Sequence, residues 1–292
     1  MLDARYHLYY SIVIFLMLGI GILIGASLYG PVQVHQQNQA VQKLASETNT
    51  VVQQRNEIQG RLDNDEQALA SLRPLLVHGK LLGKRIVLIQ TGDYADGTQS
   101  ANQCLEDAGA TVTATVVLTE QWSVLSTKQR AALASISDTP EPAAQDKALL
   151  ASLASVLVHG TLIEPSGATV LTKLQQIGLM TLSGDLSQPC MLFVLVGGGS
   201  GDTSDNAPDA GLLEGFKALP GNVTVAGCEP SSAVASSISV YQSFGIATVD
   251  CIDLPLGQIA LPLALRGELG DYGIKATAKQ RLPDSLTGAS AP

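Results

Sequence analysis

The sequence predicts an α/β protein whose globular part follows one membrane helix and one coiled-coil helix. Three observations support this fold class. An uncharged apolar run lies near the amino terminus, a heptad pattern follows it, and short apolar segments then alternate with helical patterns. The 292 residues are enough to bury a sizeable core, and the 4% aromatic content indicates that this core is aliphatic.

Residues 1–30 are expected to anchor the protein in a membrane. No Lys, Arg, Asp or Glu occurs from Tyr6 to Gln42, and the run from Tyr9 to Leu28 is interrupted only by two serines. Such a run spans about 30 Å, the thickness of the hydrocarbon core of a bilayer. Because it is longer than the apolar part of a cleaved signal peptide, it favours an uncleaved single-pass anchor. Arg5 predicts a cytoplasmic amino terminus and an extracytoplasmic remainder.

Two glycines in this run have the spacing used by associating membrane helices. Gly21 and Gly25 form a G-x-x-x-G pair, and small residues four apart allow two helices to pack closely. Glycine is also common in membrane helices that do not associate, so the pair alone leaves both interpretations open.

Residues 31–78 are expected to form a coiled-coil segment, and Arg73-Pro74 is expected to close its helix, because proline disfavours continued helix. With Val41 at heptad position a, eight of the eleven a and d positions are apolar. Arg55 and Asp65 interrupt this seam, and such polar residues restrict register and partner choice. A homo-oligomer is favoured over one amphipathic helix folded back on the globular domain. The residues expected to associate are Gly21, Gly25, Leu62, Leu69, Leu72 and Leu76.

Residues 79–283 are expected to form the α/β domain, followed by a disordered tail at 284–292. The predicted strands are 86–91, 111–118, 191–196, 223–226 and 246–249. The predicted helices are 99–108, 127–135, 143–159, 167–177, 210–219, 231–243 and 258–266. This alternation indicates a mostly parallel sheet that is covered by helices on both faces.

Carboxylates follow several predicted strands, at the sheet edge where ligands bind in such folds. They include Asp93, Asp202, Glu229, Asp250 and Asp253. Carboxylate oxygens suit calcium or magnesium, and the GGGSGD loop offers N–H groups to an anion. That loop lacks the Lys-Ser/Thr ending of a nucleotide-binding loop, and G-x-G-x-x-G is absent, so no nucleotide cofactor is predicted. The favoured interpretation is that these residues form turns and helix caps.

Catalytic and soft-metal motifs are scarce in the sequence. None of the four histidines accompanies a G-x-S-x-G motif, so the protein is predicted not to be an enzyme. The four cysteines contain no C-x-x-C, and Cys190 with Met191 is the one local candidate for copper. Cys228 and Cys251 follow strands at one edge; they either pair in an oxidising compartment or, as we favour, are buried as small hydrophobic residues.

Nucleic acid is not an expected partner. Residues 85–292 carry ten Lys and Arg against twenty Asp and Glu, and this acidity repels phosphate backbones. No basic stripe interleaved with aromatic residues occurs along the chain.

Both ends of the chain resemble the MctB family, which is named for mycobacterial copper transport protein B. The resemblance rests on MLDARYHL and GIGILIGA near the amino terminus, and on ATVDCIDLPLGQIALPLAL and YGIKATAKQRLPD near the carboxyl terminus. Cys251 stands where many members have Asn. The signature residues in the family's order are Thr248, Val249, Asp250, Asp253, Pro255, Gly257, Gln258, Tyr272, Gly273, Lys275 and Pro283.

The resemblance implies copper efflux or copper homeostasis at the bacterial envelope, with a channel role proposed for the mycobacterial member. Relatives in corynebacteria look instead like partners of envelope and division machinery. A single apolar helix cannot enclose a pore unless several copies assemble. Two hypotheses therefore stand: a copper-homeostasis component, with copper as a possible ligand, or a non-catalytic scaffold that binds an envelope protein through its coiled coil.

Overall fold

A computed structural model of the chain describes residues 3–119, 122, 125–134, 142–163, 165–201 and 207–287. Within the helices, the side chains at 3–5, 26–40, 133–134, 142–145, 165 and 207 are not described. The chain divides into two compact units, residues 1–65 and 66–292.

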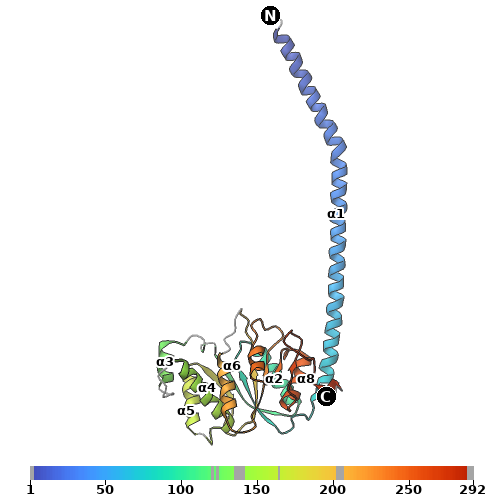
Figure 1. The fold of residues 1–292 in the computed structure, drawn as a ribbon. Coiled ribbons are helices and arrows are strands. Elements are labelled where there is room, and N and C mark those ends of the chain that lie inside the picture. The colour runs from blue at the N-terminus through green and yellow to red at the C-terminus, as the bar shows by residue number, and fades with distance from the viewer. Residues whose placement is uncertain are drawn as a thin grey trace. The chain divides into compact units, whose positions relative to one another are not determined.

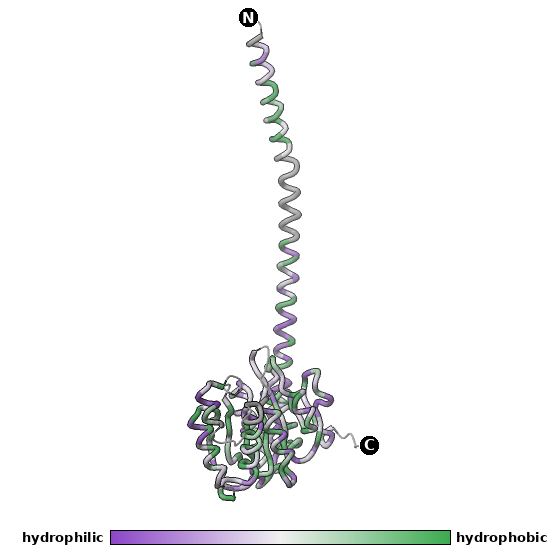
Figure 2. Tube along the Cα trace, turned by 60° about the vertical axis from the view of Figure 1, so that its left-hand side comes forward, coloured by the Kyte–Doolittle hydropathy of each residue, from purple (hydrophilic) through white to green (hydrophobic). Residues whose placement is uncertain are grey.

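A long helix, α1 (Asp3–Val77), contains both the apolar run and the heptad pattern. Its segment Tyr6–Gly25 has a mean hydropathy of 2.3, and in the described part of the chain it is the one helix segment long and apolar enough to cross a membrane. Figure 2 shows this apolar stretch near the amino terminus and the mixed polarity of residues 41–65. The predicted membrane and coiled-coil helices are therefore one continuous helix.

The prediction that this helix ends at Pro74 was wrong by one turn. His78 N donates a hydrogen bond to Pro74 O at 3.0 Å, so the last turn keeps helical pairing. Val77 is fully buried and Leu76 packs beside it against the core of the domain. The free energy gained by burying these apolar side chains outweighs the cost of the hydrogen bond that proline, which has no N–H donor, cannot make.

The domain is built on a seven-stranded mixed sheet in the order β3-β2-β1-β4-β5-β6-β7. All neighbouring strands pair in parallel except β2 and β3, which are antiparallel. These pairings confirm the prediction of a mostly parallel sheet, and Figure 1 shows the helices that flank it. The strands are β1 (Arg85–Gln90), β2 (Thr111–Leu118), β3 (Met180–Gly184), β4 (Leu192–Val196), β5 (Thr224–Cys228), β6 (Ala247–Val249) and β7 (Asp271–Tyr272).

Helices cover both faces of this sheet, and each face has its own apolar core. Alternation along β1 places Val87 and Ile89 in the first core and Ile86 and Leu88 in the second. The first core also holds residues of α4, α5 and α6, and the second those of α2, α8 and the end of α1. The helices are α2 (Ala95–Asp107), α3 (Thr127–Ala134), α4 (Pro142–His159), α5 (Pro165–Gln176), α6 (Ala207–Ala218), α7 (Ile238–Ser243), α8 (Pro255–Leu265) and α9 (Asp284–Thr287).

Several predicted elements differ from the structure. The edge strands β3 and β7 were missed, because the β3 segment MTLSG is mostly exposed and carries no apolar run, and β7 has only two residues. The helix predicted at 231–243 was wrong over its first half, because residues 231–237 form a loop that hydrogen-bonds Gly199, the buried Glu229 and the partly buried Asp253. Residues 284–287, expected in a disordered tail, form α9, and Leu286 packs against the second core. Residues 288–292 lie outside the described part.

Candidate functional site at the carboxyl edge of the sheet

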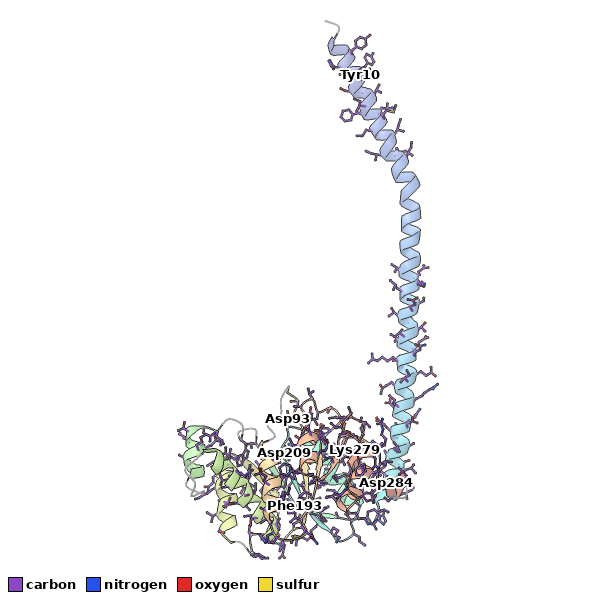
Figure 3. All side chains as sticks on the ribbon, in the orientation of Figure 1. Tyr10, Asp93, Phe193, Asp209, Lys279 and Asp284 are labelled. Atoms are coloured by element: carbon purple, nitrogen blue, oxygen red, sulfur yellow. The ribbon has the colours of Figure 1, made fainter. Side chains whose placement is uncertain are left out.

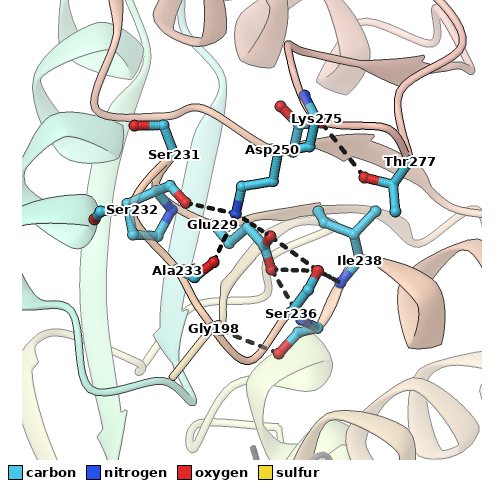
Figure 4. A network of polar contacts seen from close by, with 12 residues as sticks. Gly198, Glu229, Ser231, Ser232, Ala233, Ser236, Ile238, Asp250, Lys275 and Thr277 are labelled. Atoms are coloured by element: carbon cyan, nitrogen blue, oxygen red, sulfur yellow. Dashed lines mark hydrogen bonds and ion pairs between the residues drawn. The ribbon is translucent and has the colours of Figure 1, made fainter. Parts of the chain in front are cut away.

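Glu229 and Lys275 form a buried ion pair where the loops after β5 and β7 meet (Figure 4). Glu229 directly follows β5 and is fully buried, and Lys275 Nζ lies 2.6 Å from its Oε1. Ser236 Oγ and Ser237 N also donate hydrogen bonds to the Glu229 carboxylate, at 2.9 and 2.8 Å. A buried charge is tolerated when a partner and hydrogen bonds compensate for its lost hydration, and here both are present.

All three N–H donors of the Lys275 ammonium group are hydrogen-bonded within the domain. Besides Glu229, it donates to Pro230 O at 3.0 Å and to Ala233 O at 3.1 Å. An ammonium group has three donors, and these three acceptors match them. Lys275 therefore fastens the segment after β7 to the loop after β5.

Asp250 holds the same segment from the end of β6. It is 1% exposed and accepts hydrogen bonds from Ile274 N at 2.7 Å and Lys275 N at 3.0 Å. Gly273 has a φ of 143°, and a Cβ at this position would overlap the Asp250 carboxylate. Only glycine fits so close to that carboxylate, which explains why the two residues occur together in the signature.

Asp253 and Gln258 extend this network toward the end of α1. Asp253 accepts from Ser231 N and Oγ, both at 2.6 Å, and Gln258 Nε2 donates to Asp253 O at 3.4 Å. Arg73 of α1 donates one N–H to Gln258 Oε1 and another to Asp107 Oδ2, the latter at 2.6 Å. The signature thus forms a hydrogen-bonded path inside residues 66–292, from the end of α1 to the sheet edge.

Two further signature residues, Gly257 and Tyr272, pack closely against neighbouring groups. Gly257 of α8 lies so close to the backbone of Cys251 that a Cβ would overlap its carbonyl. Tyr272 is 2% exposed and donates its hydroxyl hydrogen to Glu268 O at 3.0 Å. Burial, followed by nearby carboxylates, raises the pKa of Tyr272 to about 12.

Asp93, after β1, is a turn residue. It accepts from Ser200 N at 3.1 and 3.0 Å and from Ser200 Oγ at 2.5 Å. Partial burial acts to raise the pKa of Asp93, but the Ser200 hydrogen bonds outweigh it and lower that pKa. Asp202 lies outside the described residues, so its role in the predicted edge stays a prediction.

The crevice that binds ligands in related sheet orders is closed by backbone in this protein. Strand order reverses between β1 and β4, which is where such a crevice opens. Here Gly92 N donates to Val196 O at 3.1 Å and Asp93 N to Gly198 O at 3.3 Å. A Cβ on Gly92 would overlap Gly197 and Gly198, so glycine lets the two loops meet directly.

Sequence reasoning missed a further buried carboxylate near this point. Asp209, in the first turn of α6, is 2% exposed and accepts from Thr91 Oγ1 at 2.6 Å and Tyr241 OH at 2.9 Å. Burial and then the Asp209 charge raise the pKa of Tyr241 well above its usual value. Figure 3 places Asp209 and Asp93 on the same side of the domain. The PDAG motif hinted at a helix start but not at this burial.

The candidate copper ligands do not converge. Cys190 is 3% exposed with its thiol toward Arg85 O and Leu192 O, at 3.2 and 3.3 Å, whereas Met191 is 45% exposed. Within the described ranges, no group of three or more His, Cys, Asp and Glu side chains is placed to hold a metal ion. The donor set in these ranges therefore does not fit a dedicated copper cage.

All four cysteines are buried with free thiols, as the interpretation of Cys228 and Cys251 as small hydrophobic residues expected for those two. Cys104 and Cys228 belong to the second core, and Cys104 and Cys251 both lie near enough to Cys228 to contribute, after burial, to its raised pKa. Burial raises the pKa of each thiol, that of Cys251 to about 12. The approach of Cys104 to Cys228 was not foreseen.

The predicted association residues lie on different faces of α1. Gly21 lines a shallow apolar groove with Val13, Met17 and neighbouring residues. Successive helix residues are about 100° apart, so Gly21 and Gly25 face roughly 150° away from the start of the heptad seam. A single straight partner helix cannot meet both faces. Leu62 and Leu72 are about half exposed, whereas Leu69 is partly buried and Leu76 packs on the domain core.

The fold and the site define a mixed α/β domain that follows a long helix with one candidate membrane span. The carboxyl-terminal signature holds the sheet edge of this domain together. The family model described as "Copper transport outer membrane protein, MctB" matches residues 1–283. The chain therefore belongs to the MctB family, as the signature predicted.

Two mycobacterial relatives extend along nearly the whole chain. They are the proteins named "Copper transporter MctB" in Mycobacterium tuberculosis (strain ATCC 25618 / H37Rv) and Mycobacterium bovis (strain ATCC BAA-935 / AF2122/97). Each is 24% identical over 302 residues, which cover 94% of this chain and 96% of the relative. The long helix and the domain are thus similar to those proteins together, not separately.

Proposed function

We propose that this protein is a non-enzymatic, membrane-anchored component of copper homeostasis at the bacterial envelope. The observation that carries the proposal is the match of the MctB family model to residues 1–283, together with relatives named copper transporters. Copper is the transported cargo in this proposal and not a resident cofactor of the domain.

The apolar segment Tyr6–Gly25 supports the anchor. Arg5 favours a cytoplasmic amino terminus, which leaves residues 31–292 outside the cytoplasm. Burial of all four thiols fits an oxidising compartment, because buried thiols do not form unwanted disulfides.

Topology and copper handling need separate experiments. Protease added to intact spheroplasts is expected to remove the domain, and a domain that survives or appears as a shortened soluble chain contradicts the anchor. Deletion of the gene is expected to raise cell-associated copper and copper sensitivity, and the wild-type gene should reverse both. Unchanged copper content and tolerance would refute the copper role.

A second candidate function is an envelope scaffold that acts through the coiled-coil part of α1. The exposed heptad side chains favour it, since Val41, Leu44 and Val51 are each more than 60% exposed. Crosslinking in intact membranes followed by identification of captured proteins discriminates the two roles. A scaffold is expected to capture a specific envelope protein through residues 41–65 with normal copper tolerance in the deletion strain.

A further inference from the structure

From Val41 to Leu62 the apolar side chains of the heptad seam of α1 are exposed, whereas Leu69 is partly buried and Leu76 packs on the domain core. Val51, Ile58 and Leu62 lie on this seam and are 63%, 60% and 51% exposed. Contiguous exposed apolar surface of this kind marks an interaction site, and a heptad spacing fits another helix.

Two charged residues interrupt the seam symmetrically. Arg55 at an a position and Asp65 at a d position lie five residues before and after Gly60. In a parallel pair in register, each residue faces its own copy. Arg55 would then face Arg55 and Asp65 would face Asp65, and like charges brought together at an interface are strongly unfavourable.

An antiparallel pair centred on Gly60 removes both conflicts. In that arrangement each a position faces a d position at the same distance beyond Gly60, so Arg55 of each copy meets Asp65 of the other. The same register sets Ile58 against Leu62 and Val51 against Leu69. Charge and apolar surface are therefore complementary at successive levels of the same register.

Residues outside the seam are compatible with this register. Arg61 of the two copies would approach each other near the centre, but within its own helix Arg61 already bonds Glu57 Oε1 at 2.7 Å. The parallel register would gain only an exposed contact between Arg61 and Glu66, and exposed ion pairs contribute little.

We propose that α1 pairs with a second copy of this chain as an antiparallel coiled coil centred on Gly60. The interface runs from Thr48 to Leu72, since Leu76 is occupied by the domain core. Together with the proposed membrane anchor, this pairing determines how far apart the two anchors lie. Gly25 of each copy is 35 residues from Gly60, so the two anchors lie roughly 100 Å apart and enter different bilayers.

Disulfide mapping with the full-length chain tests the pairing. Val51→Cys and Leu69→Cys variants are made singly and oxidised with diamide in excess detergent, so that each micelle starts with one chain. A mixture of the two is expected to give a dimer joining positions 51 and 69, with little dimer from either variant alone. The chain without an added cysteine is the control, since its native thiols are buried. Dimers from each variant alone, or none in the mixture, overturn the proposal.

Charge exchange gives an independent test by analytical ultracentrifugation in the same detergent. Arg55→Asp places Asp opposite Asp65 and is expected to lower the association constant by at least about tenfold. Adding Asp65→Arg should restore it, whereas Arg61→Gln, outside the seam, should leave it unchanged. An Arg55→Asp variant that associates like the wild type refutes the register.

A clustering experiment with vesicles that carry the full chain tests the helix pairing separately from the proposed membrane anchor. Vesicles that display the domain outward are expected to cluster, as measured by light scattering, and those with Arg55→Asp should not. Vesicles that stay apart while the disulfide forms in micelles refute the proposed anchor and leave the pairing intact.

Discussion

Replacing Lys275 with Met should destabilise the domain far more than loss of an ordinary surface ion pair. The change leaves Glu229, which is fully buried, without its counter-ion, and removes two further hydrogen bonds to Pro230 O and Ala233 O. Removing one partner of a buried pair typically costs 3–5 kcal/mol, and because the Lys275 side chain is 20% exposed we expect about 3 kcal/mol. For a domain of this size that corresponds to a lower unfolding midpoint by roughly 10 °C.

Thermal unfolding of the full chain, followed by circular dichroism, measures this effect. Lys279→Met is the matched control, because Lys279 also pairs with a carboxylate, that of Asp271 at 2.6 Å, but its side chain is 80% exposed. The control should shift the midpoint little. The double variant Glu229→Gln with Lys275→Met should recover part of the loss, since no unpaired charge remains. Equal shifts for Lys275→Met and Lys279→Met would refute the idea that the pair holds the sheet edge.

Three further predictions concern the glycine at the signature turn, copper and pH. Gly273→Ala should cost about 2 kcal/mol or more in urea unfolding, because its Cβ meets the buried Asp250 carboxylate, whereas Gly221→Ala, also at positive φ but in open space, should cost only about 1. The full chain should bind copper(I) no tighter than a surface thiol in competition with a chelator, and a stoichiometric tight site lost with Cys190→Ser would contradict this. Because the folded-state pKa of Asp93 is lowered, its stabilising effect is complete above the unfolded pKa, near 3.9, and disappears as pH falls through the folded value. The difference in midpoint between wild type and Ser200→Ala should therefore shrink below about pH 4, and a difference that grows there would reverse the sign.

The sequence alone was sufficient to predict those features of the structure that one strong local pattern governs. The uncharged run around Gly21 needs only length and polarity to be recognised as a candidate membrane span. The buried strands β1, β2, β4, β5 and β6 carry short apolar runs, and the parallel sheet follows from their alternation with helices. Motifs at both ends of the chain, of which the signature in residues 248–283 is the most specific, predicted the family.

Tertiary structure decided what local preference could not. Proline at position 74 predicts a helix end, yet α1 continues because Val77 is buried in the second core. Residues 231–237 lack a strong breaker, yet they form a loop because Glu229 and Asp253 take their hydrogen bonds. The strand β7 has only two residues, and pairing with β6 specifies it.

The candidate site shows the same division most clearly. Sequence placed Asp250, Asp253 and Glu229 at one edge of the sheet, because the carboxyl ends of parallel strands meet there. It could not decide whether these carboxylates face solvent and a ligand or turn inward. Only the folded chain brings Lys275 and the backbone after β7 to them, across long stretches of sequence. Because such pairings depend on packing between distant segments, the local sequence does not determine whether this edge binds a ligand or stabilises the fold.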